Sequence, residues 1–353
     1  MNAFTSYLEK LGSNFLVASM VPSLALAVIS ILVFDPILNI AAAFRNPQGT
    51  PQLIGVGIII FIFTVVIGFT LTALNTYILK IFEGYVQFPL VEFIYNKSLK
   101  IHRYKARSLR GERDSMAKEI ERLEDIPNRN PDMEKKLEGL KDKYYKVASN
   151  YDQTYPDNLG DILPTQFGNT LRAAEDHSAQ RYGFDGVTFW PRLIHVIPDG
   201  YKATIDSSRN ELSFLVNMSL LSGIFSALCI LAIFHTMGTT DVVSANTEVF
   251  AAFMRQVIRY MSAAVLGIVS GGFFYKASII SLGTFAHTIR ASFDLFRLDL
   301  LRKLELIRPN NSTEEFNTWL NLNEFILLGN HSLSFDPLQY RKEEQKTLPN
   351  QGK

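Results

Sequence analysis

Four long apolar runs constrain this chain more than any other feature of its sequence. A helix needs roughly 20 apolar residues to cross the hydrocarbon core of a bilayer, because each residue adds only about 1.5 Å. The runs occupy residues 15–34, 53–79, 212–234 and 260–282, and Lys276 near one end of the last can extend to the lipid headgroups. The sequence therefore predicts an all-α, polytopic membrane protein with four transmembrane helices per subunit.

Lys and Arg are distributed unevenly among the segments that connect these runs. The connection 80–211 holds 21 of the 35 Lys and Arg residues, and the segment after residue 282 holds nine. The connections 35–52 and 235–259 hold one and two. Cytoplasmic loops carry the excess of Lys and Arg in membrane proteins. We therefore expect a bacterial inner-membrane protein with both termini and the large middle segment in the cytoplasm.

Apolar spacing also predicts helices outside the membrane. The second run is expected to continue into a long helix, the segment PNRNP at 127–131 breaks it, and a heptad pattern follows from Met133 to Val147. After residue 282 the fourth run is expected to continue to Pro309, and Ser312 with Glu315 predicts a capping box for a helix ending near Gly329. The predicted order is an amphipathic helix at 1–14, transmembrane helices at 15–79, a cytoplasmic helical domain at 80–211 with a hairpin at 88–150, transmembrane helices at 212–282, cytoplasmic helices at 283–339 and a disordered tail at 340–353.

Polar residues follow one side of the second apolar run. Helical spacing places five residues on one face: Thr64, Gly68, Thr72, Asn75 and Glu83. A polar face within a membrane helix usually points toward protein or water rather than lipid. Two interpretations remain open: the face lines a pore in a ring of subunits, or it packs against a neighbouring helix.

Small residues recur four apart in every run, as at Ser219, Gly223 and Ala227. Such stripes let membrane helices approach closely. They either pack the four helices of one subunit or join subunits, and we expect a homo-oligomer.

A basic segment follows the second run, with seven cations between Lys97 and Arg113 and aromatic residues among them. Four residues are the candidates for binding phosphate groups: Lys100, Arg103, Arg107 and Arg110. The phosphates could belong to anionic lipid, or to a nucleotide or single-stranded oligonucleotide. In a further interpretation the segment is a solvated helix face without a ligand. Duplex nucleic acid is not expected.

The stretch LRAAEDHSAQRYGFDGVTFWPRL at 171–193 concentrates titratable side chains. Its first half reads as the end of a helix stopped by Gly183, and Pro191 is expected to hold Trp190 extended. The positive and negative charges balance, which favours a salt-bridged structural elbow over a binding site. The elbow residues are Arg172, Glu175, Arg181, Asp185, Trp190 and Arg192.

Motifs that would carry catalysis or hold a cofactor are missing from the sequence. There is no P-loop, no glycine-rich dinucleotide fingerprint, no GxSxG and no HExxH, and the single cysteine, Cys229, lies inside an apolar run. Glu175, Asp176 and His177 are adjacent on a predicted helix and point apart, so they cannot converge on a metal. We predict no catalytic residue, no metal site, no cofactor and no enzymatic activity.

Two segments, FGNTLRAAEDHSAQRYGFDGVTFWPRL at 167–193 and ASFDLFRLDLLRKL at 291–304, carry a resemblance. The chain from about 164 to 304 resembles a family of uncharacterised bacterial four-span membrane proteins, which implies no catalytic residues. The architecture alone is similar to that of membrane effectors of antiphage systems, such as the channel-forming partner of the Hailong system. In such systems an enzyme makes a nucleotide signal and the membrane partner depolarises the cell.

These expectations combine into two functional hypotheses. The first is a homo-oligomeric ion channel or membrane-permeabilising effector, gated by its cytoplasmic domain in response to a nucleotide or oligonucleotide signal in antiphage defence. In this hypothesis the basic helix continues the pore-lining helix, so a ligand there would move the pore wall. The alternative is a non-conducting membrane scaffold that recruits a cytoplasmic partner.

Overall fold

A computed structural model describes residues 15–38, 50–86, 92–239, 247–329, 338 and 340 of the chain. The described residues form helices and contain no β-strand, only one isolated bridge between Leu306 and Tyr340. The expectation of an all-α fold is therefore confirmed for this part of the chain. The predicted N-terminal helix at 1–14 and nearly all of the predicted tail at 340–353 lie outside the described residues.

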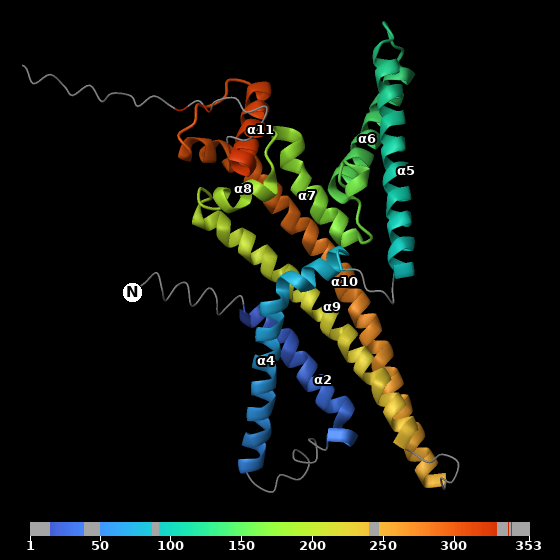
Figure 1. The fold of residues 1–353 in the computed structure, drawn as a ribbon. Helices are drawn as coiled ribbons and strands as arrows, with labels where there is room; N and C mark the ends of the chain where they lie inside the picture. Colours follow the sequence, from blue (N-terminus) through green and yellow to red (C-terminus); the bar gives the residue numbers. More distant parts are fainter. Residues whose placement is uncertain are drawn as a thin grey trace, which may run out of the picture. The chain divides into compact units, whose positions relative to one another are not determined.

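Four stretches of helix among the described residues are long and apolar enough to cross a membrane (Figure 1). The first begins with a π-helical turn, η1 (Leu16–Met20), and continues as α2 (Val21–Leu38). The others are α4 (Thr50–Glu83), α9 (Asp199–Thr239) and α10 (Thr247–Lys303). The number of candidate spans matches the prediction. Helices α9 and α10 extend well beyond the predicted apolar runs, since charged helix formers continue each helical pattern.

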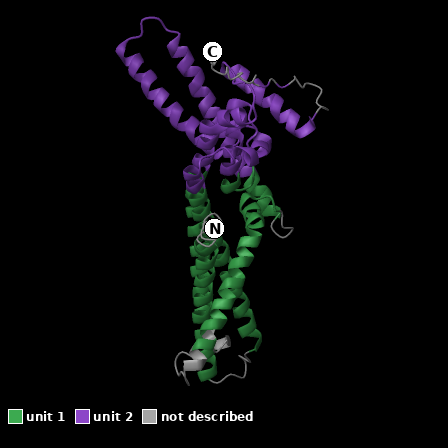
Figure 2. Ribbon diagram, turned by 90° about the vertical axis from the view of Figure 1, so that its left-hand side faces the viewer, with its two compact units in different colours: residues 1–99, 163–168, 206–285 green, residues 100–162, 169–205, 286–353 purple. Residues whose placement is uncertain are grey.

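The chain divides into two compact units (Figure 2). Unit 1 comprises residues 1–99, 163–168 and 206–285, and unit 2 comprises residues 100–162, 169–205 and 286–353. Unit 1 therefore contains the apolar stretches of all four candidate spans. Helices α5, α7 (Gln166–Tyr182), α9 and α10 contribute residues to both units.

Polar contacts hold the first candidate span inside unit 1. The Ser19 and Thr72 hydroxyl oxygens lie 2.9 Å apart and join η1 to α4. The buried Asn217 amide nitrogen donates to the carbonyl oxygen of Ala18 at 2.7 Å and joins α9 to η1. In hydrocarbon such groups have no water to bond, so these contacts favour one arrangement of the helices.

Small residues bring α9 and α10 into close contact, and the two helices lie side by side in Figure 1. The Ser219 hydroxyl donates to the carbonyl oxygen of Gly271 at 3.0 Å. A Cβ atom on Gly267 would lie 2.2 Å from the Ser226 hydroxyl oxygen and 3.1 Å from the carbonyl oxygen of Ser222, so a larger residue would crowd this contact. The small residues of this helix pair therefore pack within one subunit, as one of the two interpretations expected.

The expected continuity between the second span and the basic helix is wrong. Helix α4 ends at Glu83, and Gly84 adopts a φ of 87°, a left-handed conformation that glycine tolerates best. The hydroxyl of Thr165 donates to the carbonyl oxygen of Glu83 at 2.9 Å. A Cβ atom on Gly84 would lie 2.5 Å from Pro164. The segment 163–168 thus binds the end of α4 and stops the helix there.

Helices α5 (Glu92–Glu124) and α6 (Pro131–Thr154) form the predicted hairpin, slightly displaced from the predicted range 88–150. The side chain of Asn130 caps α6 by accepting from the backbone N–H of Met133 at 2.8 Å, and Pro131 occupies the first turn. Lys136 on α6 pairs with Glu119 on α5 at 3.3 Å. Leu137 in the heptad pattern is buried. The apolar side of α6 therefore packs on α5 of the same chain.

Short helices complete unit 2: η3 (Leu159–Asp161), the part of α7 (Gln166–Tyr182) after Gly168, α8 (Gly186–Leu193) and α11 (Ser312–Leu328). Helix α10 ends at Lys303, earlier than the predicted stop at Pro309. The cap of α11 is Asn311, whose side chain accepts from the backbone N–H of Glu314 at 2.9 Å, so the predicted Ser312 and Glu315 box is wrong by one residue. Asn is as good an N-cap as Ser, and it comes first in the chain. The predicted end at Gly329 is confirmed.

Candidate functional site

The polar row of α4 is largely turned toward the first candidate span of the same subunit. Thr64 is only 3% exposed. A Cβ atom on Gly68 would lie 3.3 Å from the ring of Phe15 and 3.4 Å from Met20. Thr72 is more exposed, and its hydroxyl donates to the carbonyl oxygen of Gly68 at 3.0 Å as well as contacting Ser19. The part of the row from Thr64 to Thr72 thus packs against a neighbouring helix. This is the second of the two interpretations of the row, the first being a pore lining.

Asn75 and Glu83 have different surroundings. Asn75 is half-buried, and its amide oxygen has no hydrogen-bond partner among the described residues. The Thr64 hydroxyl lacks a partner in the same way. Glu83 is the last residue of α4 and is half-buried beside the segment 163–168. The five residues therefore do not form one continuous lining, and Thr64 and Asn75 each carry a polar atom that has no hydrogen-bond partner among the described residues.

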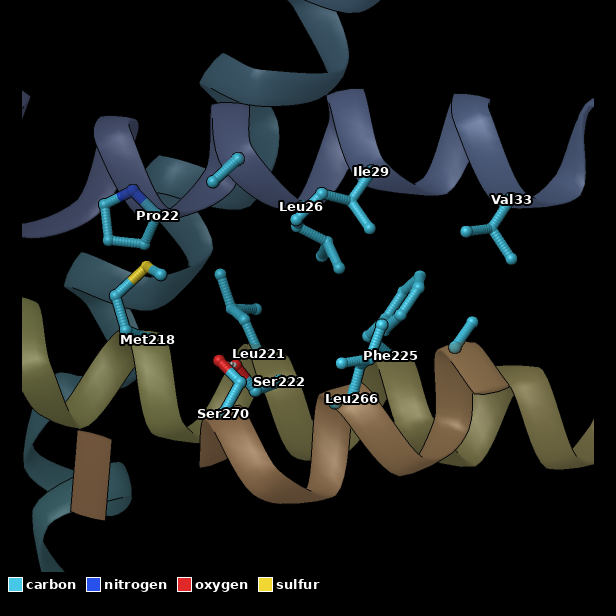
Figure 3. Close-up of a pocket in the computed structure, with 13 residues that line it drawn as sticks. Pro22, Leu26, Ile29, Val33, Met218, Leu221, Ser222, Phe225, Leu266 and Ser270 are labelled. Atoms are coloured by element: carbon cyan, nitrogen blue, oxygen red, sulfur yellow. Dashed lines mark hydrogen bonds between the residues drawn. The ribbon is translucent and has the colours of Figure 1, made fainter. Parts of the chain in front are cut away.

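An apolar cavity of about 340 Å³ lies elsewhere in unit 1, between α2, α9 and α10 (Figure 3). Leu26, Val33 and Phe225 are among the side chains that line it. The hydroxyls of Ser222 and Ser270 lie 3.3 Å apart and can satisfy each other. No charged side chain lines this cavity. It cannot hold an ion, and it is separate from the polar row of α4.

The four phosphate-binding candidates lie along one side of α5, at spacings of 3, 4 and 3 residues, but they differ in burial. Lys100 and Arg107 are exposed, as is Lys105 beside them. Arg103 is half-buried, and its Nε has no partner among the described residues. Arg110 donates to the carbonyl oxygen of Asp157 at 3.2 Å. The predicted single basic patch is therefore divided into an exposed half and a half that faces the hairpin partner.

Aromatic side chains accompany the buried half of the basic helix. The Arg113 guanidinium lies 5.1 Å from the centre of the Tyr151 ring, a cation–π contact, and 3.8 Å from the Asp152 carboxylate. The Nδ1 of His102 lies 3.2 Å from the Tyr155 hydroxyl. Burial lowers the pKa of His102, and the positive charge of Lys105 lowers it further. This side of α5 combines cations with aromatic rings and also holds the hairpin together.

The elbow between α7 and α8 contains the predicted ion pair. The Arg172 guanidinium lies 3.3 Å from Glu175, 3.6 Å from Asp176 and 3.8 Å from Asp161. Burial alone would lower the pKa of Arg172, but these carboxylates outweigh it and raise that pKa. Burial raises the pKa of Glu175 and of Asp176, against the opposing effect of Arg172. One cation therefore pairs with three carboxylates at this position.

Other elbow residues differ from the prediction. Gly183 follows the last residue of α7 at a φ of 71°, as expected. Trp190 is helical rather than extended, because Asp185 caps α8 by accepting from Val187 and from the Thr188 hydroxyl. The cap begins a helix that accommodates Pro191 in its second turn. Arg181 and Arg192 are exposed, and Arg192 donates to the carbonyl oxygen of Thr188 in its own helix. The five charged elbow residues therefore do not form one salt-bridged network: Arg172 pairs with Glu175, while Asp185 caps α8 and Arg181 and Arg192 are exposed.

Sequence reasoning missed a polar cluster that joins α7, α10 and α11. The Asp294 carboxylate accepts from the Tyr182 hydroxyl at 2.8 Å and lies 3.3 Å from His177 Nε2. Arg297 binds Glu315 at 2.7 Å and stacks 3.9 Å from the centre of the Tyr182 ring. Burial lowers the pKa of His177, with a further lowering by Arg181, while Asp294 opposes both. Burial raises the pKa of Tyr182, and Asp294 raises it further.

An aromatic core lies beside this cluster. The ring centres of Phe184 and Phe189 are 4.5 Å apart, and Trp319 lies 4.4 Å from Phe184 in an edge-to-face arrangement. Phe293 of α10 lies 5.4 Å from Phe184. Buried aromatic pairs of this kind stabilise a fold beyond their buried area. These aromatic side chains join α8, α10 and α11.

The described residues show no arrangement that suits metal binding, since no three His, Cys, Asp or Glu side chains among them gather closely enough to hold an ion. Comparison of the chain with known protein families, with curated proteins and with solved structures gave no match. The class that the structure itself defines is an all-α protein with four helices able to cross a membrane.

Proposed function

We propose that the protein is a homo-oligomeric ion channel or membrane-permeabilising effector of the bacterial inner membrane, with both termini in the cytoplasm. The observation that supports this most directly is Asn75. It lies in an apolar helix, and its amide oxygen has no partner among the described residues of one subunit. A bare amide group in hydrocarbon costs several kcal/mol.

Asn75 is half-buried, and its amide oxygen is covered within the subunit. A ring of subunits that presents the exposed part of this side chain toward its centre would give that part either water or the same residue of a neighbouring subunit. One four-helix subunit is too thin to enclose a pore, so conduction requires several copies. Thr72, which is exposed one turn away, would extend the polar lining.

The second candidate function is a non-conducting scaffold that recruits a cytoplasmic partner. It is favoured by the burial of Thr64 and by the contact of Gly68 with Phe15 and Met20, because these polar positions already serve packing within one subunit. In a scaffold, Asn75 would bond to a neighbouring subunit without admitting water.

Gating in the proposed channel would use α10 rather than the α4–α5 connection. Helix α10 is continuous over 57 residues and carries Asp294 and Arg297 of the polar cluster near its end. The proposed signal is a nucleotide or oligonucleotide, received where Arg103 and Arg110 lie among aromatic side chains. This combination suits phosphates and bases. The biological setting we propose is antiphage defence.

Planar-bilayer recording of the purified protein tests the proposal. We expect discrete currents, with or without an added oligonucleotide, and their loss or strong reduction in Asn75→Leu. Thr70→Val is the matched control: Thr70 is exposed on α4 and bonds back to Val66 at 2.8 Å, so its loss should leave the current unchanged. Absence of current under every condition, with both variants behaving like the wild type, would favour the scaffold.

A further inference from the structure

One face of α5 combines exposed cations with exposed apolar side chains. This outer face consists of Lys100, Ile101, Tyr104, Lys105 and Arg107. Tyr104 is 75% exposed and Ile101 is 44% exposed. Ala106, on the other side, is fully buried. The outer face belongs to unit 2 and contacts none of its other helices closely enough to be covered.

The charge on the outer face has a single sign. From residue 93 to residue 111 the chain holds no Asp or Glu. The exposed side of α6, by contrast, mixes acids and bases, with Glu134 beside Lys135 and Asp142 beside Lys143. An ordinary solvated helix face resembles α6. A helix that carries cations around exposed apolar side chains is typical of one that lies on a membrane surface.

The short connection between α4 and α5 limits how far α5 can lie from the end of a candidate span. Helix α4 ends at Glu83, and α5 begins at Glu92. Even a fully extended connection of this length reaches only about 30 Å. If α4 crosses the bilayer, the start of α5 therefore lies within about 30 Å of the end of that span.

We propose that the outer face of α5 binds anionic lipid headgroups, with Lys100, Lys105 and Arg107 on the phosphates. Tyr104 and Ile101 then enter the boundary between headgroups and acyl chains. This inference rests on the membrane location in the proposed function but not on conduction. Lipid suits this face better than an oligonucleotide does, because Ile101 offers no ring for a base to stack on. The half-buried Arg103 and Arg110 lie outside the site.

The full chain in lipid nanodiscs provides the test. In a Cys229→Ala background, an environment-sensitive fluorophore is placed at Ser108→Cys on α5 or at Ser149→Cys on α6, both exposed serines. Quenching by headgroup spin-labelled lipid is compared in phosphatidylcholine alone and with added phosphatidylglycerol. We expect phosphatidylglycerol to increase quenching at position 108 and to leave position 149 unchanged. In about 1 M salt the increase should disappear, because the Debye length falls to about 3 Å.

Removing the three cations of the outer face tests whether these side chains bind the lipid. Lys100→Gln, Lys105→Gln and Arg107→Gln together should lower the ratio of bound to unbound helix by roughly 160-fold, equivalent to about 1 kcal/mol per cation. The matched control changes three exposed lysines of α6, Lys135, Lys143 and Lys146, to Gln and should have no effect.

Equal quenching at the two positions, or an unchanged signal in the α5 triple variant, would overturn the proposal. So would tight binding of a short oligonucleotide in neutral lipid that the same triple variant abolishes, which would assign the face to nucleic acid. Failure of the chain to enter nanodiscs would overturn the membrane location as well, whereas absence of ion current would leave this inference standing.

Discussion

The contact between Gly168 and the end of α4 should make Gly168→Ala destabilising, although Gly168 is a helical residue. Gly168 lies in the first turn of α7, where Ala normally stabilises a helix by up to about 1 kcal/mol. Here a Cβ atom would lie 2.2 Å from the carbonyl oxygen of Glu83 and 2.9 Å from Leu163. A backbone oxygen cannot rotate away as a flexible side chain can.

The loss of unfolding free energy in Gly168→Ala depends on how far the backbone around residue 168 must move. The α4 end and the segment 163–168 have to separate by about 1 Å, which resembles overpacking of a core and costs about 1–3 kcal/mol. The separation also weakens the bond from the Thr165 hydroxyl to the Glu83 carbonyl, worth about 1 kcal/mol. After subtraction of the helix-propensity gain, we expect a net loss of about 1–3 kcal/mol.

Thermal unfolding of the full chain in detergent, followed by tryptophan fluorescence, measures this loss. Gly139→Ala on α6 is the control: a Cβ atom there meets nothing within 4 Å, so the variant should be as stable as the wild type or slightly more stable. A melting temperature for Gly168→Ala at or above that of Gly139→Ala would refute the reasoning.

Three further predictions concern the packing of each unit. Arg297→Ala leaves the carboxylate of Glu315 without its 2.7 Å partner in a mostly buried site, so we expect a loss of about 3–5 kcal/mol in unfolding experiments, whereas Glu315→Gln should lose less. His177→Gln should flatten the pH dependence of the melting temperature. Burial lowers the folded pKa of His177, so the unfolded chain takes up a proton near pH 6.5 before the folded chain does, and stability falls as pH drops through that value. Gly267→Leu should separate α9 from α10 and abolish a disulfide engineered between them, while Gly272→Leu, where a Cβ atom meets nothing within 4 Å, should not.

Local chemistry explains what the sequence could predict. Apolar runs of about 20 residues identify the four candidate spans, and the stop signals at Gly183 and Gly329 are backbone requirements that a single residue satisfies. The hairpin follows from Asn130 with Pro131 and from heptad spacing. Each of these features depends on residues within one or two helical turns.

Long-range contacts explain what the sequence could not predict. The stop at Gly84 depends on Pro164 and Thr165, which are about 80 residues away in the chain. Nothing in the local sequence around Asp294 and Arg297 indicates that they bind Tyr182 and Glu315. Charges that pair only after the chain has folded leave no periodic signal.

The contacts of the polar row of α4 could likewise be predicted only in part from the sequence. Helical spacing places Thr64, Gly68 and Asn75 on one side of the helix, and this is correct. Spacing does not say what faces that side: the structure buries Thr64, places Gly68 against Phe15 and Met20, and leaves both the Thr64 hydroxyl and the Asn75 amide oxygen without a hydrogen-bond partner among the described residues.

The accessibility of position 75 to water tests the central claim most directly. In intact membrane vesicles with Cys229→Ala, Asn75→Cys is treated with a membrane-impermeant thiol reagent, and Leu74→Cys at the same depth serves as the control. The proposed pore predicts rapid modification at position 75 and slow modification at position 74, where the side chain is 45% exposed on another side of α4. Equal and slow modification at both positions would contradict a water-filled lining and leave Asn75 as a packing residue.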